Sequence, residues 1–155
     1  MSEHQELQEL LTWLDSHIDY ERVAPTRRSL PSLSSMEEMA TLLGNPEQAY
    51  PVIHITGTNG KGSTSTIATA LLVAMGLSVG TYTSPNLENV AERIALGGLP
   101  IDDAPFTEAL DRLRLLDGLL QESPTRFELL TMAAFGAFAD AAVDVAVVEV
   151  GLGGS

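Results

Sequence analysis

Apolar residues at the start of the chain recur with the spacing of an α-helix. They are Leu7, Leu10, Leu11, Leu14 and Ile18. Steps of three or four residues place such positions on one face of a helix. Ser2 and Gln5 have the spacing of a capping box, in which each side chain accepts a hydrogen bond from the backbone N–H of the other residue. The pattern predicts an amphipathic N-terminal helix.

A loop and a second, shorter helix are expected next. Residues 21–35 are rich in proline, arginine and serine, which is typical of a loop. Ser35 and Glu38 then have the pattern of a helix start, and Gly44 has the pattern of a helix end. We therefore expect a helix over residues 36–43 and describe residues 1–50 as a helical lead-in.

The pattern then changes to strand, helix and strand. Residues 52–55 form a short β-branched run before a glycine cluster, which predicts a buried strand. Residues 62–75 follow with helical spacing, where Ile67, Leu71 and Leu72 are the large apolar positions and Gly76 is a plausible cap. Residues 77–83 resemble a second strand. This order predicts a βαβ unit, and therefore a parallel sheet.

The rest of the chain continues the alternation of strands and helices. The segment RIALGGLPI predicts a hairpin that turns at Gly97 and Gly98. A helix is expected over residues 105–120, and Thr125 with Glu128 has the spacing of a second capping box before a helix that reaches about residue 141. The segment VDVAVVEVG, residues 143–151, is apolar on both faces, as an interior parallel strand should be. The chain thus has the pattern of an α/β fold with a mostly parallel sheet and flanking helices.

Composition and charge exclude several classes of protein. The chain has 155 residues, of which 45% are hydrophobic, enough for one domain with a sizeable core. Its formal net charge of -13 argues against binding to nucleic acid or to an anionic membrane surface, because both require a basic face. There is no cysteine, so disulfide and thiolate chemistry are excluded and the composition suits a reducing cytosol.

Targeting and membrane segments are not expected either. The most apolar stretch, residues 133–150, is interrupted by Asp140, Asp144 and Glu149, so it does not predict a membrane span. The N-terminus is acidic and amphipathic, whereas a signal peptide has a basic start followed by an apolar core. We expect a cytoplasmic protein.

The glycine-rich segment HITGTNGKGST, residues 54–64, carries the chain's single lysine. Gly57, Gly60 and Gly62 allow backbone amides to approach phosphate oxygens, and the helix start that follows adds unpaired N–H donors. Lys61 would reach the terminal phosphates, and the Ser63 hydroxyl would bind magnesium. The segment is a variant of the GxxxxGK[ST] pattern, because Gly62 separates Lys61 from Ser63. The alternative is an ordinary turn with a solvated lysine, but the strand before it and the helix after it favour a phosphate site.

Glu149 is the second candidate for chemistry. It lies near the end of the apolar strand 143–151, and the carboxyl ends of parallel strands open onto the ligand crevice of an α/β sheet. A carboxylate at this position would hold the magnesium ion that bridges nucleotide phosphates. The alternative is a glutamate that faces water at the end of a strand.

Four segments resemble one family of enzymes. HITGTNGKGST, GTYTSPNLENVAERI, RFELLTMAAFGAFA and VDVAVVEVGLGG occur in this order and cover most of residues 50–154. They are similar to the folylpolyglutamate synthase and dihydrofolate synthase family, within the Mur-ligase-like ATP-dependent ligases. The resemblance implies a three-layer P-loop NTPase-like domain. It also implies that residues 1–155 are the N-terminal part of a longer chain, without its C-terminal glutamate-binding domain.

The resemblance implies a reaction as well. Such enzymes join a carboxylate of dihydropteroate or folate to the amino group of L-glutamate, with ATP and Mg²⁺, through an acyl phosphate. Lys61 would be catalytic, and Ser63 and Glu149 would bind the metal. The ATP-binding positions implied by the family are Gly57, Thr58, Asn59, Gly60, Lys61, Gly62, Ser63 and Thr64. A full-length member is expected to be a monomer.

The segment from residue 83 to residue 93 resembles the family's pterin-side loop. Ser84, Pro85, Glu92 and Arg93 match the family there, whereas Asn86 stands where many relatives have histidine. These four matching residues are the candidates for binding the folate or dihydropteroate substrate. The alternative for Glu92 and Arg93 is a neighbouring pair of surface residues.

Two other functions use the same glycine loop. A Mur-type peptide ligase of cell-wall precursor synthesis shares the phosphate site and the chemistry, although the segment TSPNLENVAERI favours the folate branch. A nucleotide-binding module that does not ligate anything is the second alternative.

Overall fold

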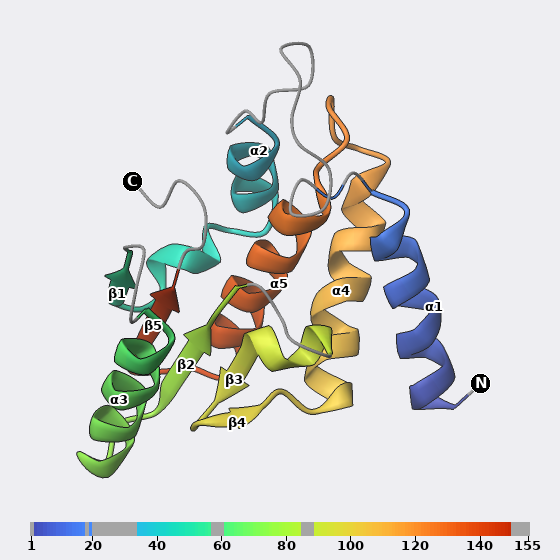
Figure 1. Cartoon of the computed structure of the whole chain (residues 1–155). Coiled ribbons are helices and arrows are strands. Elements are labelled where there is room, and N and C mark those ends of the chain that lie inside the picture. Colours follow the sequence, from blue (N-terminus) through green and yellow to red (C-terminus); the bar gives the residue numbers. More distant parts are fainter. Residues whose placement is uncertain (1, 18, 20–33, 57–60, 85–88, 150–155) are drawn as a thin grey trace. The chain divides into compact units, whose positions relative to one another are not determined.

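The computed structural model describes residues 2–17, 19, 34–56, 61–84 and 89–149, and for residues 61 and 62 the backbone only (Figure 1). Contacts within the chain divide it into two compact units. Unit 1 consists of Met1–Glu47 and Asp103–Ala137, and unit 2 of Gln48–Asp102 and Phe138–Ser155. Each unit is therefore assembled from two stretches of chain that are far apart in the sequence.

Unit 1 is helical. It contains α1 (Glu3–Asp15), α2 (Ser34–Leu42), α4 (Asp103–Asp117) and most of α5 (Arg126–Asp140). The capping box at the start of α1 is confirmed, since the Gln5 N–H donates to Ser2 Oγ at 3.3 Å and the Ser2 N–H donates to Gln5 Oε1 at 3.0 Å. The predicted amphipathic helix is confirmed as α1, which packs against α4 and ends at Asp15.

Polar contacts join the helices of unit 1. Asp117 Oδ2, at the end of α4, accepts a hydrogen bond from Trp13 Nε1 of α1 at 3.2 Å. The second capping box is also confirmed, because Glu128 N–H donates to Thr125 Oγ1 at 3.1 Å and Thr125 N–H donates to Glu128 Oε1 at 2.9 Å. The other oxygen of this buried carboxylate accepts from Ser35 Oγ of α2 at 2.9 Å. Glu128 therefore caps the start of α5 and also links α2 to α5 by a hydrogen bond.

Unit 2 contains a mixed sheet of five strands with the order β1-β5-β2-β3-β4. The strands are β1 (Val52–Ile55), β2 (Val79–Tyr82), β3 (Ile94–Leu96), β4 (Leu99–Pro100) and β5 (Val145–Glu149). The first three positions in this order are parallel, as the βαβ pattern predicted, and β3 and β4 pair antiparallel. The sheet is therefore mixed rather than mostly parallel. The predicted hairpin turn is confirmed at Gly97 and Gly98, whose φ values of 63° and 85° suit a primed turn.

Helix α3 (Lys61–Ala74) packs on the sheet of unit 2, with a core formed by Val79, Val145, Val147 and partly buried neighbours that include Leu72. Two of the large apolar residues of α3, Ile67 and Leu71, do not belong to this core. Their exposed fractions are 59% and 60%, because smaller residues of α3 face the strands instead.

The burial predicted for residues 52–55 is also wrong. Val52 and Ile53 are 44% and 41% exposed. The reason is that β1 lies at the edge of the sheet and pairs only with β5 among the strands of the described residues. By contrast, β2 and β5 have neighbours on both sides and are buried throughout.

A close approach between β2 and α5 sets the packing of unit 2. A Cβ atom placed on Gly80 would lie 2.7 Å from both Cε1 and Cγ of Phe138. The Phe138 ring is fully buried and also meets Tyr50 edge-on, with 6.1 Å between the ring centroids.

Among the residues that the structure describes, no helix combines the length and the apolar character needed to cross a bilayer.

Candidate functional site

The register of the parallel strands brings the predicted site residues to one edge of the sheet. Ile55, the last residue of β1, is opposite Glu149, the last residue of β5. Tyr82 of β2 is opposite Val148, so the chain leaves β2 toward Ser84 at the same edge. These are the carboxyl ends of three adjacent parallel strands, where α/β sheets bind ligands.

The glycine loop connects this edge to α3. Gly57, Thr58, Asn59 and Gly60 lie outside the described residues, and at Lys61 and Gly62 only the backbone is described. Helix α3 begins at Lys61, and Ser63 and Thr64 are exposed in its first turn. The first four N–H groups of a helix have no partner within the helix, so this end of α3 offers donors to an anion.

Glu149 is buried at the end of β5, with an exposed fraction of 6%. Its Oε2 accepts a hydrogen bond from Ser65 Oγ of α3 at 3.4 Å. Within the described part of the chain, no Lys or Arg forms an ion pair with this carboxylate. Removing a carboxylate's charge from water costs several kcal/mol, so a buried carboxylate needs a compensating partner, and among the described residues Glu149 has only this long hydrogen bond. The alternative, a glutamate that faces water, is therefore wrong, and the buried carboxylate suits a bound cation.

A complete metal centre made only of protein side chains is not present among the described residues. No three His, Asp or Glu side chains there gather closely enough to hold an ion. A cation at Glu149 would therefore take further oxygens from hydroxyl groups such as that of Ser63, from water or from a ligand. This donor set of a single carboxylate, a hydroxyl and ligand oxygens is the one that Mg²⁺ uses with nucleotides.

The residues predicted to bind substrate lie at the two ends of one loop. Ser84 follows β2 and is buried, and Pro85 lies outside the described residues. Glu92 and Arg93 belong to the 3₁₀ helix η2 (Val90–Arg93). The Thr83 N–H donates to the Arg93 carbonyl oxygen at 2.8 Å, so the two ends of the loop are held together. Glu92 is exposed, whereas Arg93 is only 3% exposed and is not the surface residue that the alternative required.

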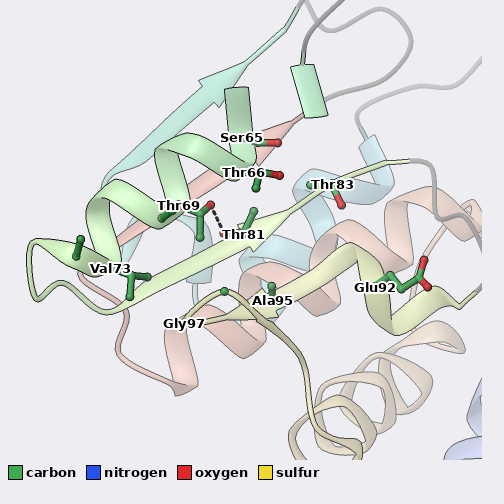
Figure 2. A pocket seen from close by; sticks show the side chains of 12 residues that line it. Ser65, Thr66, Thr69, Val73, Thr81, Thr83, Glu92, Ala95 and Gly97 are labelled. Carbon is green, nitrogen blue, oxygen red and sulfur yellow. Dashed lines mark hydrogen bonds between the residues drawn. The ribbon is translucent and has the colours of Figure 1, made fainter. Parts of the chain in front are cut away.

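A pocket of about 550 Å³ lies between α3 and the β2–β3 surface of unit 2 (Figure 2). Hydroxyl groups of Ser65, Thr66 and Thr83 line one end, together with Glu92. Val73 and the hairpin glycines line the other end. The pocket is therefore polar toward the strand ends and apolar toward the hairpin.

Comparison with known proteins identifies the family. No protein-family model matches the chain. The dihydrofolate synthase/folylpolyglutamate synthase of Mycobacterium tuberculosis is 42% identical over 141 residues, which are 84% of this chain and 29% of the relative. The folylpolyglutamate synthase of Thermotoga maritima matches 98% of this chain and 34% of its own, with a TM-score of 0.86 and 35% identity. The chain belongs to the folylpolyglutamate synthase and dihydrofolate synthase family.

Two further structures of folylpolyglutamate synthases contain ligands. The enzyme of Mycobacterium tuberculosis complexed with ADP and AMPPCP is 39% identical, with a TM-score of 0.82 over 98% of this chain and 33% of that one. A folylpolyglutamate synthase in complex with AMPPCP and folate is 36% identical, with a TM-score of 0.80 over 95% of this chain and 35% of that one. The chain spans about a third of the length of these relatives.

Three buried hydroxyl residues near the site were not singled out from the sequence. Ser65 and Thr69 lie one turn apart on the sheet-facing side of α3, and Thr69 Oγ1 is 2.8 Å from Thr81 Oγ1 of β2. The spacing of four residues between Ser65 and Thr69 was visible in the sequence. A serine and a threonine at this spacing give no hydrophobic signal, so the apolar pattern of the segment does not distinguish them.

Proposed function

We propose that this chain is the nucleotide-binding part of an ATP-dependent ligase that joins L-glutamate to the carboxylate of dihydropteroate or of a (poly)glutamylated folate. The observation that supports this best is the buried carboxylate of Glu149, in register with the end of β1 and beside the start of α3. An α/β sheet with a carboxylate at that edge is what a three-layer P-loop NTPase-like domain requires. The glutamate-binding domain would belong to the remainder of a full-length chain.

In this proposal residues 57–64 hold the phosphates of ATP. The backbone N–H groups of the loop and of the first turn of α3 would donate to phosphate oxygens. Lys61 would bind the γ-phosphate, and its charge would offset the negative charge that this phosphate carries during transfer. Ser63 and Glu149 would hold Mg²⁺, which supplies charge neutralisation between the β- and γ-phosphates when bound.

The reaction follows from this arrangement. The acceptor carboxylate would attack the γ-phosphorus of ATP, so that an acyl phosphate forms and ADP leaves. The amino group of L-glutamate would then attack the acyl carbon, release inorganic phosphate and form the amide. The phosphate cradle contributes to the first step by holding the γ-phosphate in line with the attacking oxygen.

The acceptor is proposed to lie beside the loop that starts at Ser84 and ends at Arg93. The hydrogen bond between Thr83 and Arg93 fixes the two ends of this loop near the strand edge. Ser84, Pro85, Glu92 and Arg93 are the residues proposed to contact it, and Glu92 also lines the mouth of the pocket. The relative with bound folate and AMPPCP supports the pairing of these two ligands.

The test is an assay of ADP release by the full-length protein with ATP, Mg²⁺ and L-glutamate. Dihydropteroate and tetrahydrofolate are compared as acceptors, and ADP should appear only when an acceptor and glutamate are both present. Turnover with a cell-wall nucleotide precursor instead would assign a Mur-type peptide ligase. ATP binding without ligation of any acceptor would assign a nucleotide-binding module.

Lys61→Ala provides the matched site variant. It should abolish turnover and leave the circular dichroism spectrum unchanged, because a lysine at the first position of a helix is not needed for the fold. Arg114→Ala is the control for loss of a cation, since Arg114 is exposed on α4 and pairs with Asp111 three residues before it. Full activity of the Lys61 variant would remove Lys61 from the mechanism.

A further inference from the structure

Ser65 occupies an unusual position for a helical serine. It lies one turn after Lys61 in α3, and its exposed fraction is 1%. Its hydroxyl donates to Oε2 of Glu149, on a different element, at 3.4 Å. An ionised carboxylate has only acceptor atoms, so the proton of this hydrogen bond belongs to the serine. The two residues therefore connect the helix that follows the glycine loop with β5, the middle one of the three parallel strands.

The length of this hydrogen bond decides what it does. Hydroxyl donors usually lie about 2.5–3.0 Å from an oxygen acceptor, and a longer bond withdraws less of the carboxylate's charge. The contact therefore leaves most of the negative charge available, and it restrains the direction of the Glu149 side chain together with the burial of both residues. A metal ligand needs both properties, because an outer hydrogen bond fixes its orientation while its charge binds the ion.

We propose that Ser65 is a positioning residue for Glu149. Its hydroxyl holds the carboxylate in the orientation that binds a divalent cation next to the nucleotide phosphates. This inference rests on the proposed function, because it takes Glu149 to be a metal ligand. Ser65 itself does not touch the cation; it acts through the glutamate.

A purely steric role for Ser65 makes a different prediction. A small residue is needed where α3 approaches the sheet, and alanine would serve equally well there. Thr69 provides the matched control, because it lies one turn further along the same face and its buried hydroxyl bonds to Thr81 rather than to Glu149. Ser65→Ala and Thr69→Val each remove one buried hydroxyl from α3, but only the first removes the partner of Glu149.

The experiment measures binding of Mn²⁺ to the full-length protein in the presence of ADP, from the electron paramagnetic resonance signal of free Mn²⁺. Ser65→Ala should weaken Mn²⁺ binding about tenfold, the lower end of the usual effect of removing an outer hydrogen bond to a metal ligand. Ser65→Cys, with a weaker donor of similar size, should give an intermediate affinity. Thr69→Val should stay within about twofold of the wild type, as expected for a site without a shared partner.

Glu149→Gln distinguishes failure of the positioning role of Ser65 from failure of the metal role of Glu149. If this variant weakens Mn²⁺ binding while Ser65→Ala binds like the wild type, Ser65 is only a packing residue and this inference is overturned, although the proposed function stands. If Glu149→Gln also binds Mn²⁺ like the wild type, the metal role of Glu149 fails and the inference fails with it. Equal weakening by Ser65→Ala and Thr69→Val would assign the effect to loosening of α3 and would likewise overturn it.

Discussion

Gly80→Ala should be strongly destabilising, and the structure gives the reason. The new Cβ atom would lie 2.7 Å from two atoms of the Phe138 ring, whereas carbon atoms in contact prefer about 3.5–4.0 Å. The ring or the strand would therefore have to move by about 1 Å. The ring is fully buried against Tyr50, and β2 is held by hydrogen bonds to β5 and β3 on its two sides. Neither can move without losing other contacts.

We expect a loss of about 3 kcal/mol in the free energy of unfolding, the upper part of the range for an overpacked core. Urea denaturation followed by circular dichroism measures it. Phe138→Leu removes the ring and should cost about 1 kcal/mol alone. In that background the alanine at position 80 should cost much less, so that a double-mutant cycle gives a coupling energy of about 2 kcal/mol.

Gly136→Ala is the matched control for replacing a glycine. It lies in α5, as Phe138 does, and a Cβ atom there would have nothing within 4 Å. Alanine should stabilise the helix at this position by up to about 1 kcal/mol. A Gly80→Ala variant as stable as the wild type would refute the close approach of the ring to β2. Additive costs in the double mutant would refute the ring as the cause.

Two further predictions concern the polar contacts of unit 1. Glu128→Ala should lower the free energy of unfolding by about 2–3 kcal/mol, because it removes the acceptor of both the Thr125 N–H and the buried Ser35 hydroxyl. A thermal melt measures this loss. A change below about 0.5 kcal/mol would contradict the role of Glu128 as acceptor for both groups. Asp117→Ala should lower the free energy of unfolding by about 1–2 kcal/mol, because the indole N–H of Trp13 loses its acceptor. The fluorescence emission of Trp13, the only tryptophan, should shift as well. An unchanged emission spectrum would show that this hydrogen bond does not form in solution.

The starts of two helices and the order of the elements were predictable, because they depend on local chemistry. Ser2 with Gln5 and Thr125 with Glu128 start helices through contacts within three residues. Such contacts exist whatever the rest of the chain does. The parallel pairing of the strands also followed from the pattern, because a helix between two strands imposes it.

The burial of individual residues was less predictable, because it depends on neighbours elsewhere in the sequence. In α3 the alternation of alanine and threonine with larger residues is compatible with two buried faces. In the structure, Ser65, Ala68 and Thr69 face the sheet, because their small side chains allow a close approach. Ile67 and Leu71 are exposed instead. The same limitation applies to β1, since nothing in its own sequence indicates that it forms an edge.

The candidate site was predictable in its residue types but not in its supporting contacts. A glycine loop and Glu149 are recognisable in the sequence, and the register places the ends of their strands side by side. The hydroxyl of Ser65 near that glutamate depends on how a helix lies on a sheet, which no local pattern specifies.

The position of β5 between β1 and β2 has a consequence for how the protein is made. Val52 pairs with Ala146, so the first strand must wait until residues 53–146 have been synthesised before its partner exists. Pairing between residues so distant in sequence closes a long loop and slows folding. During synthesis the β-branched edge of β1 stays available to other chains, which is the state that chaperones protect. The pairing of β1 therefore depends on residues 145–149, which are synthesised long after it.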